Sequence, residues 1–276
     1  MWIVVTDLDG TLLNHGDYSW EGARFALEEL ETRGVPVIFC TSKTRAEVEV
    51  LRRETGNKHP FITENGGAVF LPAASFAPLA GELPRMGDFL YIPLGTAYEV
   101  LVETLADTAR ETGCVVRGFA DASPEEVAAW CDFSVEEARL ARQRDFDEPF
   151  VIVSGDGHEL AAAIAHRGLT TTRGGRFWHI LGKNDKGAAL WKLRSVYTRL
   201  GLAVNVVALG DSANDLPLLS QAEIPVILPG PAAELLRQSV PEAIIARQPG
   251  SQGWSDVMRH LLRERLSDPT QSGLPW

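Results

Sequence analysis

Two aspartates one residue apart, Asp7 and Asp9, are the first residues of this chain whose types and spacing could do chemistry. They follow an apolar run, residues 2–5, and precede Gly10, a pattern that predicts a strand buried on both faces and ending in a sharp turn. Ligands bind at the carboxyl edge of open α/β sheets, so both carboxylates are expected there. At about 4 Å apart and an effective dielectric of about 20 they repel each other by about 4 kcal/mol. A divalent cation or a shared proton is therefore expected between them.

Other polar side chains follow predicted strands or begin predicted helices in the same way. Apolar runs over 35–40 and 203–209 each end in polar residues, and a helix is predicted to begin near residue 186. The side chains concerned are Thr41, Ser42, Lys43, Lys186, Asp211, Asn214 and Asp215. Because parallel strands end at one edge of a sheet, we expect these groups to converge with the two aspartates.

In this order, the residues resemble the four motifs of the haloacid dehalogenase superfamily. The motifs are Asp7-x-Asp9-Gly10-Thr11, a strand-ending Thr41, a later Lys186, and Gly210-Asp211-Ser-x-Asn214-Asp215. The large insertion between the second and third motifs resembles the members with an α+β cap, which hydrolyse mostly sugar and other small-metabolite phosphates. Within these members, segments 41–44, 64–67 and 174–179 resemble the mannosyl-3-phosphoglycerate phosphatase family. The resemblance therefore implies, as the first hypothesis, a phosphatase that hydrolyses a glycosyl-3-phosphoglycerate, with mannosyl-3-phosphoglycerate as the expected substrate.

The resemblance implies a role for each motif residue. Asp7 would attack phosphorus and form an aspartyl-phosphate, while Asp9 would act as general acid and then as general base. Thr41 and Lys186 would hold the phosphoryl oxygens. A Mg²⁺ ion, which prefers hard oxygen ligands, would lie among these acidic groups. Its predicted ligand set is Asp7, Asp9 through its backbone carbonyl, Asp211 and Asp215, with Asn214 helping to orient the site.

The residues expected to bind the rest of the substrate are less sharply defined by the sequence. They are Ser42, Lys43, Asn65, Arg142, Arg176 and Asn214, together with Thr41 and Lys186. The segment around Asn65 is also compatible with a simple hairpin turn. Arg176 is expected at the tip of a glycine-rich hairpin, where a guanidinium would match a carboxylate. Arg139 and Arg144 are expected to be solvated, and His179 is interpreted as a core histidine without a chemical role.

The pattern of elements predicts the fold class α/β, with a doubly wound, Rossmann-like parallel sheet and an inserted α+β cap. We expect the core to comprise residues 1–83 and 184–276 and the cap residues 84–183. Capping boxes, which mark helix starts, are predicted at Thr44, Thr96, Ser123 and Ser134.

Composition excludes several classes of partner. The net charge of −11 opposes binding to nucleic acid or an anionic membrane, and no apolar run is long enough to span a bilayer. Three cysteines without CxxC spacing indicate neither a disulfide framework nor a thiolate zinc site, so a cytoplasmic location is expected. The expected partner is a small phosphorylated sugar or glycerate, bound by a monomer or homodimer.

Alternatives to the first hypothesis share much of its chemistry. The substrate could instead be glucosyl-3-phosphoglycerate, sucrose phosphate or a hexose phosphate. A phosphomutase would use the same aspartate pair but return the phosphoryl group to a sugar. A catalytically silent phospho-ligand sensor is a third alternative, which the intact set of motif residues disfavours.

Overall fold

The apolar run after Met1 forms an interior strand of a nine-stranded sheet in the computed structural model, which describes residues 1–174 and 177–265. This strand, β1 (Trp2–Thr6), lies between β11 (Asn205–Gly210) and β2 (Val37–Cys40) and is parallel to both. The parallel part of the sheet continues with β12 (Ile224–Ile227) and β13 (Ile244–Ile245) beyond β11, and with β3 (Phe61–Thr63) beyond β2. Central strands with no solvent-exposed face explain the uninterrupted apolar runs.

Helices cover both faces of this sheet. Val4 packs with one hydrophobic cluster, whereas its neighbours Ile3 and Val5 pack with another on the opposite face. The first cluster includes side chains of α1 (Arg24–Thr32), α2 (Arg45–Thr55) and α10 (Gly250–Glu264). The second includes side chains of α7 (Lys186–Arg199), α8 (Leu216–Leu219) and α9 (Ala233–Ser239). The doubly wound α/β prediction is confirmed.

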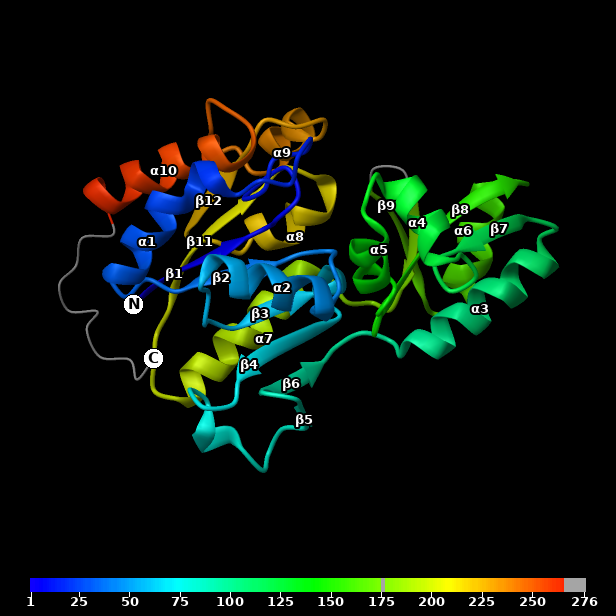
Figure 1. The fold of residues 1–276 in the computed structure, drawn as a ribbon, viewed down its shortest axis with the longest axis horizontal. Helices are drawn as coiled ribbons and strands as arrows, with labels where there is room; N and C mark the ends of the chain where they lie inside the picture. Colours follow the sequence, from blue (N-terminus) through cyan, green and yellow to red (C-terminus); the bar gives the residue numbers. More distant parts are fainter. Residues whose placement is uncertain (175–176, 266–276) are drawn as a thin grey trace.

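The inserted cap lies beside the core (Figure 1). It has its own four-stranded antiparallel sheet, with the order β7-β8-β10-β9. Its strands are β7 (Val115–Gly118), β8 (Asp147–Ser154), β9 (Thr170–Gly174) and β10 (Phe177–Leu181). Two hydrophobic clusters hold helices to this sheet. One contains residues of α3 (Tyr98–Glu111) and α6 (Gly157–His166), and the other contains residues of α4 (Pro124–Cys131) and α5 (Val135–Ala141).

Three antiparallel strands extend the large sheet before the chain enters the cap. They are β4 (Ala68–Pro72), β5 (Arg85–Met86) and β6 (Phe89–Pro93), and β6 pairs with both β4 and β5. The segment 85–93, expected within the insertion, therefore pairs with the core sheet. We propose that the cap begins after Pro93 and ends near residue 183.

The predicted helix-capping boxes are confirmed at three of the four positions. Thr44, Ser123 and Ser134 form capping boxes with the glutamates three residues later. The prediction at Thr96 is wrong, because α3 begins after Ala97 without a side-chain cap. In the described part of the chain, four 3₁₀ turns complete the elements, namely η1 (Glu21–Ala23), η2 (Glu64–Gly66), η3 (Ala77–Leu79) and η4 (Ala213–Asp215). Within the described ranges, no helix has the length and apolar character needed to cross a membrane.

Candidate active site

Asp7 leaves the end of β1 at the carboxyl edge of the sheet and is almost completely buried. Its backbone N–H donates to the carbonyl of Leu209 at 2.9 Å, and its own carbonyl accepts from Thr6 Oγ1 at 2.7 Å. Thr6 Oγ1 in turn accepts a hydrogen bond from the buried Trp254 indole at 3.0 Å. Strand pairing and these two side-chain hydrogen bonds therefore fix the backbone that presents the Asp7 carboxylate.

Gly10 allows the chain to turn directly after the two aspartates. Its φ of +79° lies in the left-handed region that side chains disfavour, and a Cβ there would lie 2.6 Å from Asp211 Oδ2. A Cβ at this position would also lie 2.3 Å from His15 Nε2, so it would press on the His15 ring and the Asp211 carboxylate together. The glycine is required by close packing as well as by the turn.

Lys186, the first residue of α7, connects two of the aspartates. Its Nζ donates to Asp7 Oδ1 and to Asp215 Oδ1, each at 2.6 Å, and the side chain is only 1% exposed. Burial alone would lower the pKa of Lys186, but the carboxylates of Asp215 and Asp7 outweigh it and raise the pKa above its usual range. The ammonium therefore stays charged inside the site.

The loop after β11 presents Asp211 toward Asp7. Asp215 Oδ2 accepts from the backbone N–H groups of Asp211 at 3.0 Å and Ser212 at 2.9 Å, so Asp215 braces the loop. Asp211 Oδ1 accepts from Thr11 Oγ1 at 3.2 Å, and Asp211 Oδ2 lies 3.2 Å from His15 Nε2. The sequence did not indicate His15, which has no motif position, and Thr11 appeared only as part of the first motif.

The donor set fits a hard divalent cation. Carboxylate oxygens of the buried residues Asp7, Asp211 and Asp215 lie within 4.8 Å of one another. Burial raises the pKa of Asp7 and of Asp211, and the neighbouring carboxylates add to the rise despite Lys186. A bound divalent cation would relieve this excess of negative charge, and all-oxygen sites suit Mg²⁺. Asp215 already uses both oxygens in hydrogen bonds, which suits positioning better than direct ligation.

Asp9 faces Lys43 at the end of the neighbouring strand. Lys43 Nζ lies 3.0 Å from Asp9 Oδ1 and 3.8 Å from Glu47 Oε1, and it also lies over the rings of Tyr18 and Phe133. Burial opposes the charge on Lys43, but Asp9 and Glu47 raise its pKa above the usual range. Lys43 is thus a partly buried cation beside the proposed acid, and the ring of Phe133 in the cap also contacts it.

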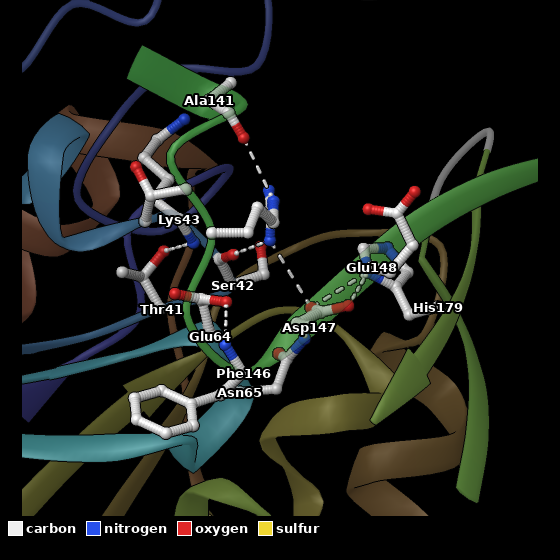
Figure 2. A network of polar contacts seen from close by, with 12 residues as sticks. Thr41, Ser42, Lys43, Glu64, Asn65, Ala141, Phe146, Asp147, Glu148 and His179 are labelled. Atoms are coloured by element: carbon white, nitrogen blue, oxygen red, sulfur yellow. Dashed lines mark hydrogen bonds and ion pairs between the residues drawn. The ribbon is translucent and has the colours of Figure 1, made fainter. Parts of the chain in front are cut away.

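The turn η2 of the core contacts the cap. It contains Asn65 and Glu64, and both side chains are buried. Asn65 adopts a left-handed conformation, with φ of 55°, so the predicted tight turn is confirmed. The Glu64 carboxylate accepts the backbone N–H of Phe146 at 2.7 Å (Figure 2). It also accepts the backbone N–H of Asp145 at 3.0 Å. Burial raises the pKa of Glu64 to about 8, although Arg144 opposes the rise. Glu64 therefore binds the cap backbone, a role that the sequence did not reveal.

Arg144 corrects the prediction made for the arginines near the end of α5. Arg139 is exposed and pairs with Glu136, as expected. The prediction that Arg144 is solvated is wrong, since its side chain is only 6% exposed and Nη1 donates to the Ser42 carbonyl at 3.2 Å. The docking of the cap onto the core buries it, and local sequence carries no signal of that docking. Arg142 instead donates from Nε to the carbonyl of Phe119.

A cleft of about 570 Å³ lies between core and cap, within the usual size range of small-molecule sites. The predicted residues that line it are Asp7, Asp9, Ser42, Lys43, Asn65, Asp211 and Asn214. Thr41, Lys186 and Asp215 are buried and do not line it. Arg142 does not line it either, and Arg176 lies outside the described residues. The structure thus brings the four motifs together, and the cap arginines proposed from sequence stay predictions.

Comparison with known proteins agrees with this arrangement. Residues 4–79 match the model of haloacid dehalogenase-like hydrolases. A glucosyl-3-phosphoglycerate/mannosyl-3-phosphoglycerate phosphatase of Methanococcoides burtonii is 38% identical over 263 residues, which cover 94% of this chain and 97% of that protein. The chain belongs to the haloacid dehalogenase-like hydrolases.

Two further known proteins are similar to this chain in sequence or in fold. The mannosyl-3-phosphoglycerate phosphatase of Pyrococcus horikoshii is 34% identical and covers 78% of this chain and 86% of its own length. A haloacid dehalogenase-like hydrolase from Bacteroides thetaiotaomicron has a similar crystal structure, with a TM-score of 0.64 at 17% identity over 94% of this chain and 98% of that one. The second likeness concerns the fold alone.

Proposed function

We propose that this hydrolase is a Mg²⁺-dependent phosphatase that removes phosphate from glycosyl-3-phosphoglycerates, mannosyl and glucosyl alike. The observation that carries the proposal is the buried cluster in which Lys186 joins Asp7 to Asp215 beside Asp211. Asp7 and Asp211 of this cluster line a cleft of substrate size. A relative that covers nearly the whole chain bears both substrates in its name.

The chain's own residues suit transfer of a phosphoryl group to Asp7 and then to water. Lys186 holds Asp7 Oδ1, and Asp7 Oδ2 has no hydrogen-bond partner in the described part of the chain, so we assign Oδ2 as the attacking atom. Asp9 would protonate the leaving oxygen and later take a proton from the hydrolytic water. Lys43 would exchange its contact with Asp9 for one with the phosphoryl oxygens.

Asp7, Asp211 and the Asp9 carbonyl would hold the Mg²⁺ ion, with Asp215 bracing the loop. When bound, the ion would supply positive charge to the phosphoryl oxygens. Asn214 donates to Asn65 Oδ1 at 2.9 Å, so the acidic loop is tied to the turn that contacts the cap. Thr41 is completely buried, and its hydroxyl accepts the Lys43 backbone N–H at 3.1 Å. Thr41 would therefore fix the conformation of the loop that carries Ser42 and Lys43.

The test is phosphate release from purified protein across a panel of substrates. The panel contains both glycosyl-3-phosphoglycerates, sucrose phosphate and a hexose phosphate, each assayed with Mg²⁺ and with a chelator. We expect Mg²⁺-dependent release with the highest kcat/KM for the glycosyl-3-phosphoglycerates. A higher kcat/KM for a hexose phosphate would refute the substrate assignment. Turnover that required a bisphosphorylated activator would instead indicate a phosphomutase.

A further inference from the structure

Three polar cap side chains meet in or directly behind the wall of the cleft. Asp147, the first residue of β8, is completely buried and lies beside His179 of β10 (Figure 2). His179 Nδ1 lies 3.0 Å from each Asp147 oxygen, and Arg144 Nη1 lies 3.6 Å from Asp147 Oδ2. Burial opposes the charge on Asp147, but His179 and Arg144 hold its pKa below the usual value. The charged carboxylate thus orients both basic side chains.

Arg144 and His179 each use some of their nitrogens in contacts with the protein and leave one nitrogen without a partner in the described residues. Arg144 donates from Nε to the Ala141 carbonyl and from Nη1 to the Ser42 carbonyl, while Nη2 has no hydrogen-bond partner in residues 1–174 and 177–265. His179 uses Nδ1 for Asp147, and its Nε2 has no partner within the same ranges. Both residues line the cleft, so both groups can reach a bound molecule.

A short chain of hydrogen bonds links Asp147, the shared partner of Arg144 and His179, to the acidic loop of the reaction centre. Asn65 Nδ2 donates to Asp147 Oδ2 at 3.2 Å, and Asn65 Oδ1 accepts from Asn214 at 2.9 Å. Asn214 belongs to the acidic loop that carries Asp211. Two hydrogen bonds therefore separate this loop from Asp147. A small substrate whose phosphate lies at Asp7 would place its next polar group near the cap.

We infer that Arg144 and His179 form a subsite for the glycerate carboxylate of the substrate, with Asp147 as a positioning residue. The inference rests on the proposed function, which supplies a substrate that carries this carboxylate. A guanidinium offers parallel N–H groups that match a carboxylate, and imidazolium donates from both ring nitrogens. The sugar would then face the cap aromatic side chains of the cleft wall, Phe119, Trp130 and Phe177.

The test uses Mg²⁺-loaded full-length protein with Arg144→Lys and His179→Gln. Arg139→Lys, in the helix α5 that precedes Arg144, is the matched control. The measured quantity is kcat/KM for a glycosyl-3-phosphoglycerate divided by kcat/KM for p-nitrophenyl phosphate, which has no carboxylate. Loss of a charge-assisted hydrogen bond should lower this ratio by roughly 10- to 100-fold, chiefly through KM. The control should keep the wild-type ratio, because Arg139 is exposed and pairs only with Glu136 among the described residues.

Calorimetry tests the subsite without turnover. Wild-type protein should bind glucosylglycerate more tightly than glucosylglycerol, which lacks the carboxylate, and His179→Gln should reduce the difference. Ratios within about twofold of wild type in both variants, equal losses on both substrates, or no preference in calorimetry would each overturn the inference. Absence of hydrolysis of any glycosyl-3-phosphoglycerate by wild-type protein would refute the proposed function instead, and the calorimetric preference would still decide the subsite.

Discussion

Replacing Asp7 with Asn should abolish phosphate release and yet stabilise the metal-free protein. Asp7 is buried among acidic neighbours, and its pKa is raised well above the usual value by burial and by Asp215, Asp211 and Asp9, against the opposing effect of Lys186. The folded protein therefore favours an uncharged group at this position when no cation is bound. An amide is such a group, but it lacks the nucleophilic oxygen.

The size of the effect follows from the spacing of the carboxylates. Oxygens of Asp7, Asp211 and Asp215 lie within 4.8 Å of one another. Two unit charges at that distance and an effective dielectric of about 20 repel by about 3.5 kcal/mol. The substitution removes such repulsions but also the attraction to Lys186, which keeps Asp215 as its partner. We expect a net stabilisation of about 1 to 3 kcal/mol, or roughly 3 to 8 °C in Tm.

The pH dependence of stability independently checks whether Asp7→Asn stabilises the metal-free protein. A carboxyl group whose pKa is raised by folding contributes less stability as pH rises from its unfolded-state value, about 3.9, toward its folded-state value. The advantage of Asp7→Asn should therefore be near zero at about pH 4 and grow above it. Saturating Mg²⁺ should reverse the order, because the ion stabilises the wild-type protein more than the variant.

Thermal unfolding monitored by circular dichroism, with a chelator and with Mg²⁺, measures both effects. Asp107→Asn is the control, since Asp107 is an exposed partner of Arg110 and its loss should change stability by under about 0.5 kcal/mol. If the metal-free Asp7→Asn protein were less stable than wild type at pH 8, the proposed balance of charges in the site would be wrong.

Three other substitutions test separate parts of the site. Lys186→Ala leaves buried carboxylates unpaired. It should lower kcat at least about 10³-fold and the free energy of unfolding by about 3 to 5 kcal/mol. Steady-state kinetics and urea denaturation measure these losses. Glu64→Gln should flatten the loss of stability between about pH 4.5 and 8, because the folded-state pKa of Glu64 is raised to about 8; an unchanged slope in urea titrations would contradict this. Gly10→Ala should reduce the Mg²⁺-induced rise in Tm and lower activity at least about tenfold, because a Cβ would press on Asp211; a wild-type metal response would refute the close-packing argument.

The sequence alone determined the chemistry of the core. Asp7, Lys186 and Asp211 each stand at the end of an apolar strand or the start of a helix, and such positions meet whenever parallel strands share a sheet. The pattern of buried runs therefore sufficed to predict both the doubly wound fold and the convergence of these groups. The capping box at Thr44 was equally local, since all its atoms lie within one helical turn.

Only the tertiary structure decided how the cap meets the core. Arg144 follows a short amphipathic helix and is indistinguishable in sequence from the exposed Arg139, but docking on Ser42 buries it. Glu64 and Asp147 are likewise defined by partners about 80 residues away. Such contacts depend on the relative placement of two separate sheets, which no short-range pattern of residues encodes. The physical cause is that burial of these charges is a property of the interface and not of any local segment.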